Sequence, residues 1–99
     1  MAARTRYLLT YDITSSARWR KVYKLAQDHG EWLQYSVFVC DLTDVELVSF
    51  KRELVELINL KQDSVSIFNL GPSTSRGVEC IEMIGAQSFI EKGNGPTVW

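Results

Sequence analysis

The chain has 99 residues, which is the length of one domain with a thin hydrophobic core. Its apolar fraction is ordinary for a globular protein, and we expect no membrane span because no apolar run approaches ~20 residues. We expect no signal peptide because only five strand-like residues separate Arg6 from Asp12. Two cysteines, Cys40 and Cys80, and one histidine, His29, cannot supply the about four ligands of a structural zinc site. We therefore expect a cytoplasmic protein with reduced cysteines, and homodimerisation as a way to enlarge the core.

The net charge of −1 hides an uneven distribution of charged residues. Residues 1–24 contain six basic residues and one acidic residue, whereas residues 25–99 contain five basic and eleven acidic residues. A basic segment in an otherwise acidic chain indicates one local anionic partner. The alternative is a solvated helix face whose charges serve solubility.

The first two predicted elements are a strand at residues 5–13 and a helix at residues 16–29. Odd-numbered residues of the strand are the more apolar set, so we expect them to face the helices and Asp12 to lie on the opposite face. The loop before the helix can cap it, and Gly30 suits a left-handed cap at its end. The inward stripe of the helix is predicted to consist of Trp19, Val22, Tyr23 and Ala26.

The later elements are predicted from capping, periodicity and turn residues. Residues 31–42 are predicted to form two strands that break near Gln34–Ser36. A helix follows, from a capping box at Thr43 and Glu46 to about Asn59. The remaining elements are a strand at residues 65–70, a flexible connection at residues 71–77 and a fifth strand at residues 78–84.

This order of elements is typical of an α+β, ferredoxin-like βαββαβ sandwich with an additional C-terminal strand. Residues 1–84 would form the domain, and residues 85–99 would be a tail that is disordered or docks on a partner. Two helices on one face of the sheet leave the other face open, which strengthens the expectation of a homodimer.

Asp12 is the main candidate for chemistry. At the end of a central strand, on the face without helices, it would approach its own copy in a two-fold dimer, and two close carboxylates repel unless a proton or a cation lies between them. A divalent ion such as Mg²⁺ suits this site and could activate water for attack on a phosphodiester. Alternatively, Asp12 caps a helix or pairs with Arg18.

Several residues near Asp12 are candidates for nucleic-acid binding. Guanidinium and ammonium groups bind phosphates, a hydroxyl can contact a phosphate, and an aromatic ring can stack on a base. Alternatives are an exposed helix face for the basic residues and a core position for Phe38. The candidates are Arg18, Arg20, Lys21, Lys24, Ser36 and Phe38.

Over residues 5–84 the chain resembles the CRISPR-associated protein 2 family, the small protein of spacer acquisition. The resemblance is carried by short motifs in a specific order, namely Tyr11-Asp12-Ile13, Lys21-Val22, Gly30, Gln34-Tyr35-Ser36-Val37-Phe38 and Asp63-Ser64-Val65.

This resemblance implies a ferredoxin-like homodimer whose fifth strand packs on the partner's sheet. It implies that Asp12 binds Mg²⁺ or Mn²⁺ at the dimer interface, and that the protein is a metal-dependent nuclease on single-stranded RNA or double-stranded DNA. It also implies a bridge between subunits of the CRISPR integrase, with Arg18 and Arg20 on nucleic acid and Ser36 and Phe38 near the site.

The chain departs from the family where further acids often stand. Thr14, Ser15 and Ser16 follow the aspartate, Val39 follows the phenylalanine, and Trp19 replaces a frequent basic residue. One obvious carboxylate per chain gives weight to a catalytically silent DNA-bridging scaffold, and an RNA-cleaving toxin of similar fold is a further alternative. A small-molecule sensor or an RNA-recognition motif is disfavoured, since neither the glycine-rich loop nor the basic-glycine-aromatic signature is present.

Overall fold

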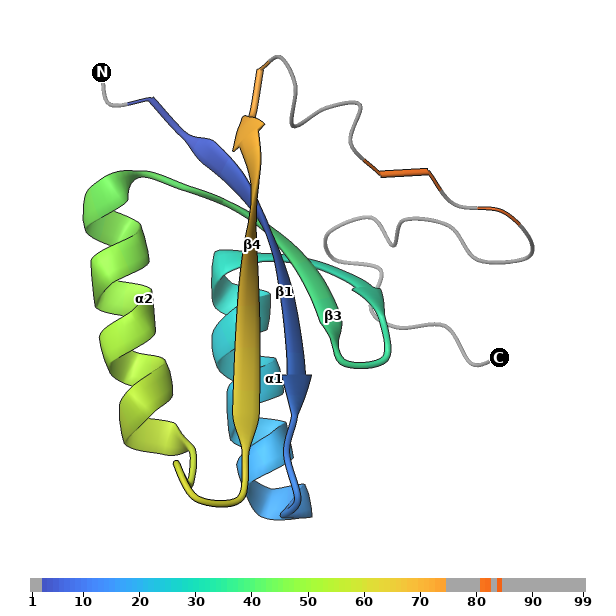
Figure 1. Cartoon of the computed structure of the whole chain (residues 1–99), viewed down its shortest axis with the longest axis vertical. Helices are drawn as coiled ribbons and strands as arrows, with labels where there is room; N and C mark the ends of the chain where they lie inside the picture. The colour runs from blue at the N-terminus through green and yellow to red at the C-terminus, as the bar shows by residue number, and fades with distance from the viewer. Residues whose placement is uncertain (1–2, 75–80, 83, 85–99) are drawn as a thin grey trace.

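The computed structural model describes residues 3–74, 81–82 and 84. Six elements follow one another in the order βαββαβ (Figure 1). They are β1 (Thr5–Asp12), α1 (Ser16–His29), β2 (Gly30–Gln34), β3 (Val37–Leu42), α2 (Asp44–Leu57) and β4 (Ser64–Pro72). The predicted α+β ferredoxin-like order is therefore confirmed for this part of the chain.

The four strands form one antiparallel sheet in the order β2-β3-β1-β4. The first strand thus lies between β3 and β4, as the ferredoxin-like fold requires. The end of β1, where Asp12 lies, is consequently in the middle of the sheet rather than at its edge. Neither described helix is long and apolar enough to cross a membrane.

The core lies between one face of the sheet and both helices. Tyr7, Leu9 and Tyr11 of β1 are buried, whereas Asp12 is exposed, so the predicted alternation of faces is confirmed. Because strand residues alternate between faces, a single face of β1 meets both helices. The core residues from the other elements are Val22, Ala26, Phe38, Cys40, Leu42, Phe50 and Leu54. Leu33 and Val39 are also buried but lie outside this cluster.

Local caps fix where the helices begin. The Ser15 side chain accepts a hydrogen bond from the Arg18 backbone N–H at 3.3 Å, and α1 starts at the next residue. At α2, Thr43 and Glu46 form the predicted capping box, with reciprocal hydrogen bonds of 3.2 and 2.9 Å. These short-range bonds explain why the starts of both helices were predictable.

Gly30 does not form the left-handed cap that we predicted. Its φ of −165° is extended, and it is the first residue of β2. A Cβ there would lie 2.3 Å from the Val39 carbonyl oxygen and 2.6 Å from Cys40 Sγ. Glycine is therefore needed because β3 packs against this backbone.

The connection predicted at residues 71–77 begins later than expected, because Gly71 and Pro72 belong to β4. The β1–β4 register shifts between Arg6 and Tyr7, and Gly71 there has a φ of 98°, which glycine adopts readily. Most of the fifth strand predicted at residues 78–84 lies outside the described residues, as does the tail at residues 85–99.

Candidate metal and nucleic-acid site

Asp12 ends β1 with an exposed side chain and pairs across the sheet with Ser64 of β4. Tyr11 points into the core, so Asp12 lies on the face that the helices leave open. Within the described ranges, no group of three or more His, Cys, Asp or Glu side chains could hold a metal ion. A metal at Asp12 would therefore draw its other ligands from water, a phosphate or a second copy of the chain, which fits the way Mg²⁺ is commonly bound.

Asp63 anchors the loop that follows Asp12. Its carboxylate accepts hydrogen bonds from the Thr14 backbone N–H at 3.0 Å, from Thr14 Oγ1 at 3.1 Å and from the Asn59 backbone N–H at 2.8 Å. The Asp63 side chain is completely buried, at 0% exposure. Every one of these bonds holds the β1–α1 loop or the α2–β4 turn in place, so Asp63 organises the surroundings of Asp12 without being open to a ligand.

Arg18 completes this cluster. Its Nε donates to Asp63 Oδ2 at 2.7 Å, and its Nη2 donates to Asp63 Oδ1 and Gln62 Oε1, each at 3.2 Å. The Arg18 guanidinium, with the backbone N–H groups of Thr14 and Asn59, holds the pKa of Asp63 well below its usual range. Arg18 pairs with Asp63 and not with Asp12, and Ser15 caps α1, so neither alternative considered for Asp12 describes this site.

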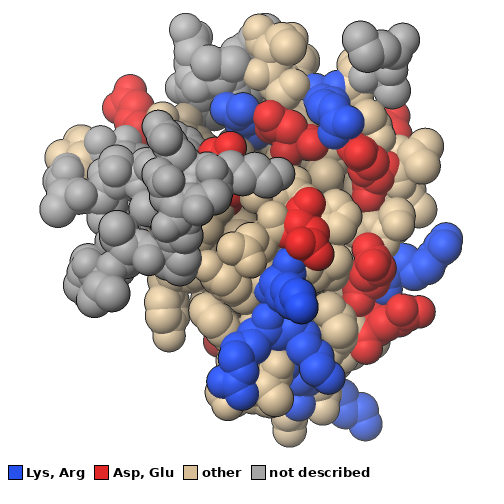
Figure 2. All heavy atoms as spheres, turned by 180° about the vertical axis from the view of Figure 1, so that it is seen from behind, with Lys and Arg blue, Asp and Glu red and all other residues tan. Residues whose placement is uncertain are grey.

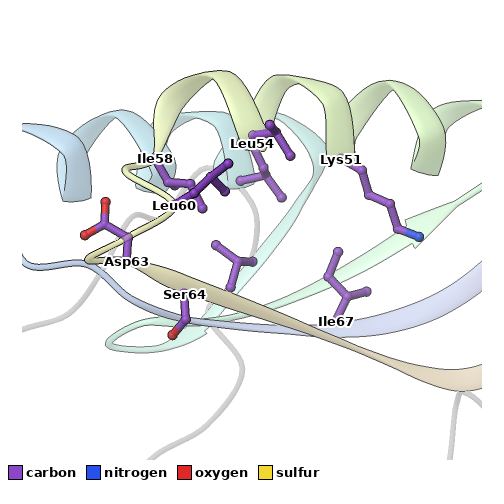
Figure 3. Close-up of a pocket in the computed structure, with 9 residues that line it drawn as sticks. Lys51, Leu54, Ile58, Leu60, Asp63, Ser64 and Ile67 are labelled. Carbon is purple, nitrogen blue, oxygen red and sulfur yellow. The ribbon is translucent and has the colours of Figure 1, made fainter.

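A groove of about 440 Å³ runs between α2 and β4 and ends at Asp63 (Figure 3). Figure 3 shows the Asp63 carboxylate turned away from the groove, towards the loop that it anchors. Leu54, Ile58 and Ile67 give the groove an apolar wall. Because the groove is mostly apolar and the Asp63 carboxylate is engaged by the loop, it is a poor candidate for a metal site.

The other three predicted basic residues form an exposed cluster on α1. Arg20, Lys21 and Lys24 are all exposed. Figure 2 shows Lys and Arg side chains gathered at the lower end of the face that carries α1, the end where this helix begins in Figure 1. Because α1 begins directly after the loop from Asp12, this positive surface lies at the same end of the molecule as the carboxylate.

Ser36 lies in the turn between β2 and β3, and the structure brings it close to the end of β1. Its backbone oxygen accepts a hydrogen bond from the Tyr11 N–H at 3.2 Å. Its Oγ accepts a hydrogen bond from Trp19 Nε1 at 3.0 Å. Ser36 therefore joins β1 to α1 next to Asp12, and its hydroxyl is engaged by an indole.

Phe38 is not available to stack on a base. Its side chain has 0% exposure and packs in the core against Tyr11 and Tyr23, at ring centroid distances of 6.3 and 5.4 Å. The core position, which was the alternative for this residue, is the correct one. The exposed aromatic side chain of the same motif is Tyr35, at 73% exposure. The sequence signal that could have identified Tyr35 as exposed was its position in the predicted break between two strands.

Two other reactive side chains near β1 are unsuitable as nucleophiles or bases. Burial raises the pKa of the Cys40 thiol to about 12 and raises the pKa of Tyr11 well above its usual value. Neither group ionises at neutral pH.

The chain is similar to a known protein family in both sequence and fold. Residues 5–77 match the family model described as CRISPR associated protein Cas2. A CRISPR-associated endoribonuclease Cas2 from Geobacter sulfurreducens is 37% identical over 67 residues, which cover 68% of this chain and 70% of that protein. A CRISPR-associated endonuclease Cas2 from Halalkalibacterium halodurans is 39% identical over 89 residues, covering 85% and 90% of the two chains. The crystal structure of Streptococcus pyogenes Cas2 superposes with a TM-score of 0.70 at 34% identity, covering 81% of this chain and 99% of that one.

Proposed function

This chain belongs to the CRISPR associated protein Cas2 family, and from that premise we propose that it is a cytoplasmic, metal-dependent phosphodiesterase of CRISPR adaptation. The observation that carries the proposal is the exposed Asp12 carboxylate at the same end of the molecule as the basic start of α1. Two of the relatives are named as an endoribonuclease and an endonuclease, so single-stranded RNA and double-stranded DNA are the substrates to test.

In this mechanism Asp12 would hold a divalent ion, Mg²⁺ or Mn²⁺. Such an ion would supply Lewis-acid chemistry, lowering the pKa of a water molecule and offsetting negative charge on the phosphoryl group. Arg20, Lys21 and Lys24 hold the flanking phosphates, and Arg18, fixed by Asp63, orients the loop beside them. Each chain contributes one carboxylate, and a second copy of the chain would contribute another.

A homodimer through the open face of the sheet would supply that copy. On this face Leu8 of β1 lies between Val39 of β3 and Phe68 of β4, which makes an apolar row across three strands. Phe68 is 50% exposed and Leu8 is part-exposed, whereas Val39 is already buried, at 6% exposure. Covering Phe68 and Leu8 would remove apolar surface from water and bring the two Asp12 side chains towards the two-fold axis.

The second candidate function is a catalytically silent scaffold that bridges integrase subunits during spacer integration. The observation in its favour is that the described residues contain one accessible carboxylate at this site and no cluster of ligands. In this case the basic surface of α1 holds DNA, and the Asp12 metal site has a structural role.

One experiment separates the two functions. Labelled single-stranded RNA and double-stranded DNA are incubated with wild type, Asp12→Asn and Asp28→Asn, each with Mg²⁺ and with chelator. We expect metal-dependent cleavage that falls at least about 100-fold in Asp12→Asn, because the metal loses its protein ligand. Asp28 is exposed near the other end of α1, so Asp28→Asn should cleave like wild type.

Cleavage that survives chelation, or that Asp12→Asn leaves intact, would contradict the proposed mechanism. Binding of either nucleic acid without cleavage, unchanged in Asp12→Asn, would favour the scaffold.

A further inference from the structure

Tyr35 stands out at the turn between β2 and β3. Among the described residues it is the one non-glycine residue with a positive φ, at 31°, and its side chain is 73% exposed. The turn has two central residues, Tyr35 and Ser36, and only Tyr35 has a positive φ. Glycine is favoured at that position, and a bulky side chain there is strained.

Folding stability does not explain a tyrosine at this position. The ring remains mostly in water, so it contributes little apolar burial, while the backbone conformation is unfavourable for it. Other contacts nevertheless hold the turn in place. Trp32 Nε1 donates to the Tyr35 carbonyl oxygen at 2.8 Å, and the neighbouring Ser36 Oγ accepts from Trp19 at 3.0 Å.

The Tyr35 ring extends a row of aromatic side chains along α1. Its centroid lies 6.1 Å from that of Trp19, and the Trp19 ring stacks on Tyr23 at 5.3 Å with an angle of 20° between the planes. This row is partly buried where it meets the core and becomes exposed at Tyr35. It thus ends in an accessible aromatic face.

Cations border this row. Arg20 and Lys24 each follow a residue of the row by one position, so they lie about 100° further round the helix. Arg18 is on the opposite flank, where it contacts Asp63 beside β4. Arg20 and Lys24 are each two positions from the buried Val22, about 200° round the helix, so they lie on its solvent-facing side, next to the aromatic row that ends at Tyr35.

We propose that Tyr35 is a stacking platform for an unpaired base of single-stranded nucleic acid whose phosphates bind Arg20 and Lys24. An exposed aromatic ring beside a basic groove is the arrangement that binds single strands independently of their sequence. The proposal rests on the nucleic-acid binding part of the proposed function and not on cleavage. It assigns to Tyr35 the base contact that Phe38, buried in the core, cannot make.

The test is binding of a fluorescent thymidine strand of about 12 nucleotides, measured in chelator by anisotropy, with an abasic strand of equal length as the second probe. Truncation in Tyr35→Ala should weaken binding of the thymidine strand about 5- to 100-fold, the usual effect of losing a stacked base. It should leave binding of the abasic strand unchanged. Tyr35→Phe, which keeps the ring, should bind both strands like wild type.

Tyr35→Asn separates stacking from folding. Asparagine tolerates a positive φ better than tyrosine, so this variant should melt at a higher temperature and yet bind the thymidine strand as weakly as Tyr35→Ala.

Equal affinity of Tyr35→Ala and wild type for the thymidine strand would overturn the proposal, as would an equal loss on both strands. Either result would leave the proposed function intact if the double variant Arg20→Ala, Lys24→Ala binds both strands more weakly than wild type. Failure of wild type to bind either strand would overturn the nucleic-acid function and this proposal with it.

Discussion

At the scale of single residues, the buried Asp63 carboxylate organises the site through contacts with Arg18 and Thr14, which are distant in the sequence. Arg18 was predicted to contact phosphate, and the sequence offered Asp12 as its nearest acidic neighbour. Its partner is instead Asp63, 45 residues further along the chain, and Asp63 also binds Thr14, 49 residues away. Such pairs are set by how the turn before β4 packs against the start of α1, and no local pattern in the sequence records them.

Asp63→Asn should destabilise the protein. The amide cannot form the ion pair with Arg18. It also places its own N–H donors where the N–H groups of Thr14, Arg18 and Asn59 already point, so some of these buried donors lose their acceptor. We expect the Tm at pH 7 to fall by roughly 10 °C. Asp28→Asn changes an exposed carboxylate on the same helix and should melt like wild type.

The stabilisation that the Asp63 carboxylate provides should depend on pH. Because the folded pKa of Asp63 is lowered, its stabilisation is complete above the unfolded value of about 3.9 and is lost as the pH falls below it. The difference in Tm between wild type and Asp63→Asn should therefore shrink in acid. A difference that stays constant from pH 7 to about pH 3 would contradict this assignment.

At the scale of elements, short-range signals predicted more than long-range ones did. Ser15 and the capping box at Thr43 placed the starts of both helices, since each cap bonds to a residue three positions away. The break between β2 and β3 was also placed correctly. The role of Gly30 was missed because the atoms that exclude a side chain there belong to β3, ten residues ahead.

Gly30→Ala should be destabilising although its φ of −165° is open to any residue. The added methyl would overlap the Val39 carbonyl oxygen and Cys40 Sγ, so β2 must move away from β3. Overpacking of this kind costs about 1–3 kcal/mol. Thermal unfolding measures it, and Glu31→Ala at the exposed neighbour is the control. An unchanged Tm would show that the junction between α1 and β2 is looser than described.

At the scale of the whole molecule, the open face of the sheet combines apolar and charged surface. The row of Val39, Leu8 and Phe68 crosses its middle, and the Arg6–Asp41 ion pair, at 2.8 and 2.9 Å, lies on the same face beyond it. Asp12 lies at the other end of β1. A two-fold partner on this face would cover the row and place two Asp12 carboxylates near each other.

This arrangement predicts that dimerisation depends on divalent metal. Two Asp12 carboxylates repel each other, and a metal that binds both stabilises the dimer by mass action. Sedimentation should therefore show a tighter dimer, and thermal unfolding a higher Tm, in millimolar Mg²⁺ than in chelator. Asp12→Asn removes the repulsion and the ligand together, so it should dimerise equally well in both conditions.

Phe68→Asp places a charge in the apolar row and should give a monomer that retains its helical circular dichroism, because Phe68 is half-exposed and outside the core. A wild-type dimer that ignores Mg²⁺ would argue against a shared metal at Asp12. A Phe68→Asp protein that remains dimeric would show that the copies meet through another surface, and the two carboxylates would then have no reason to approach each other.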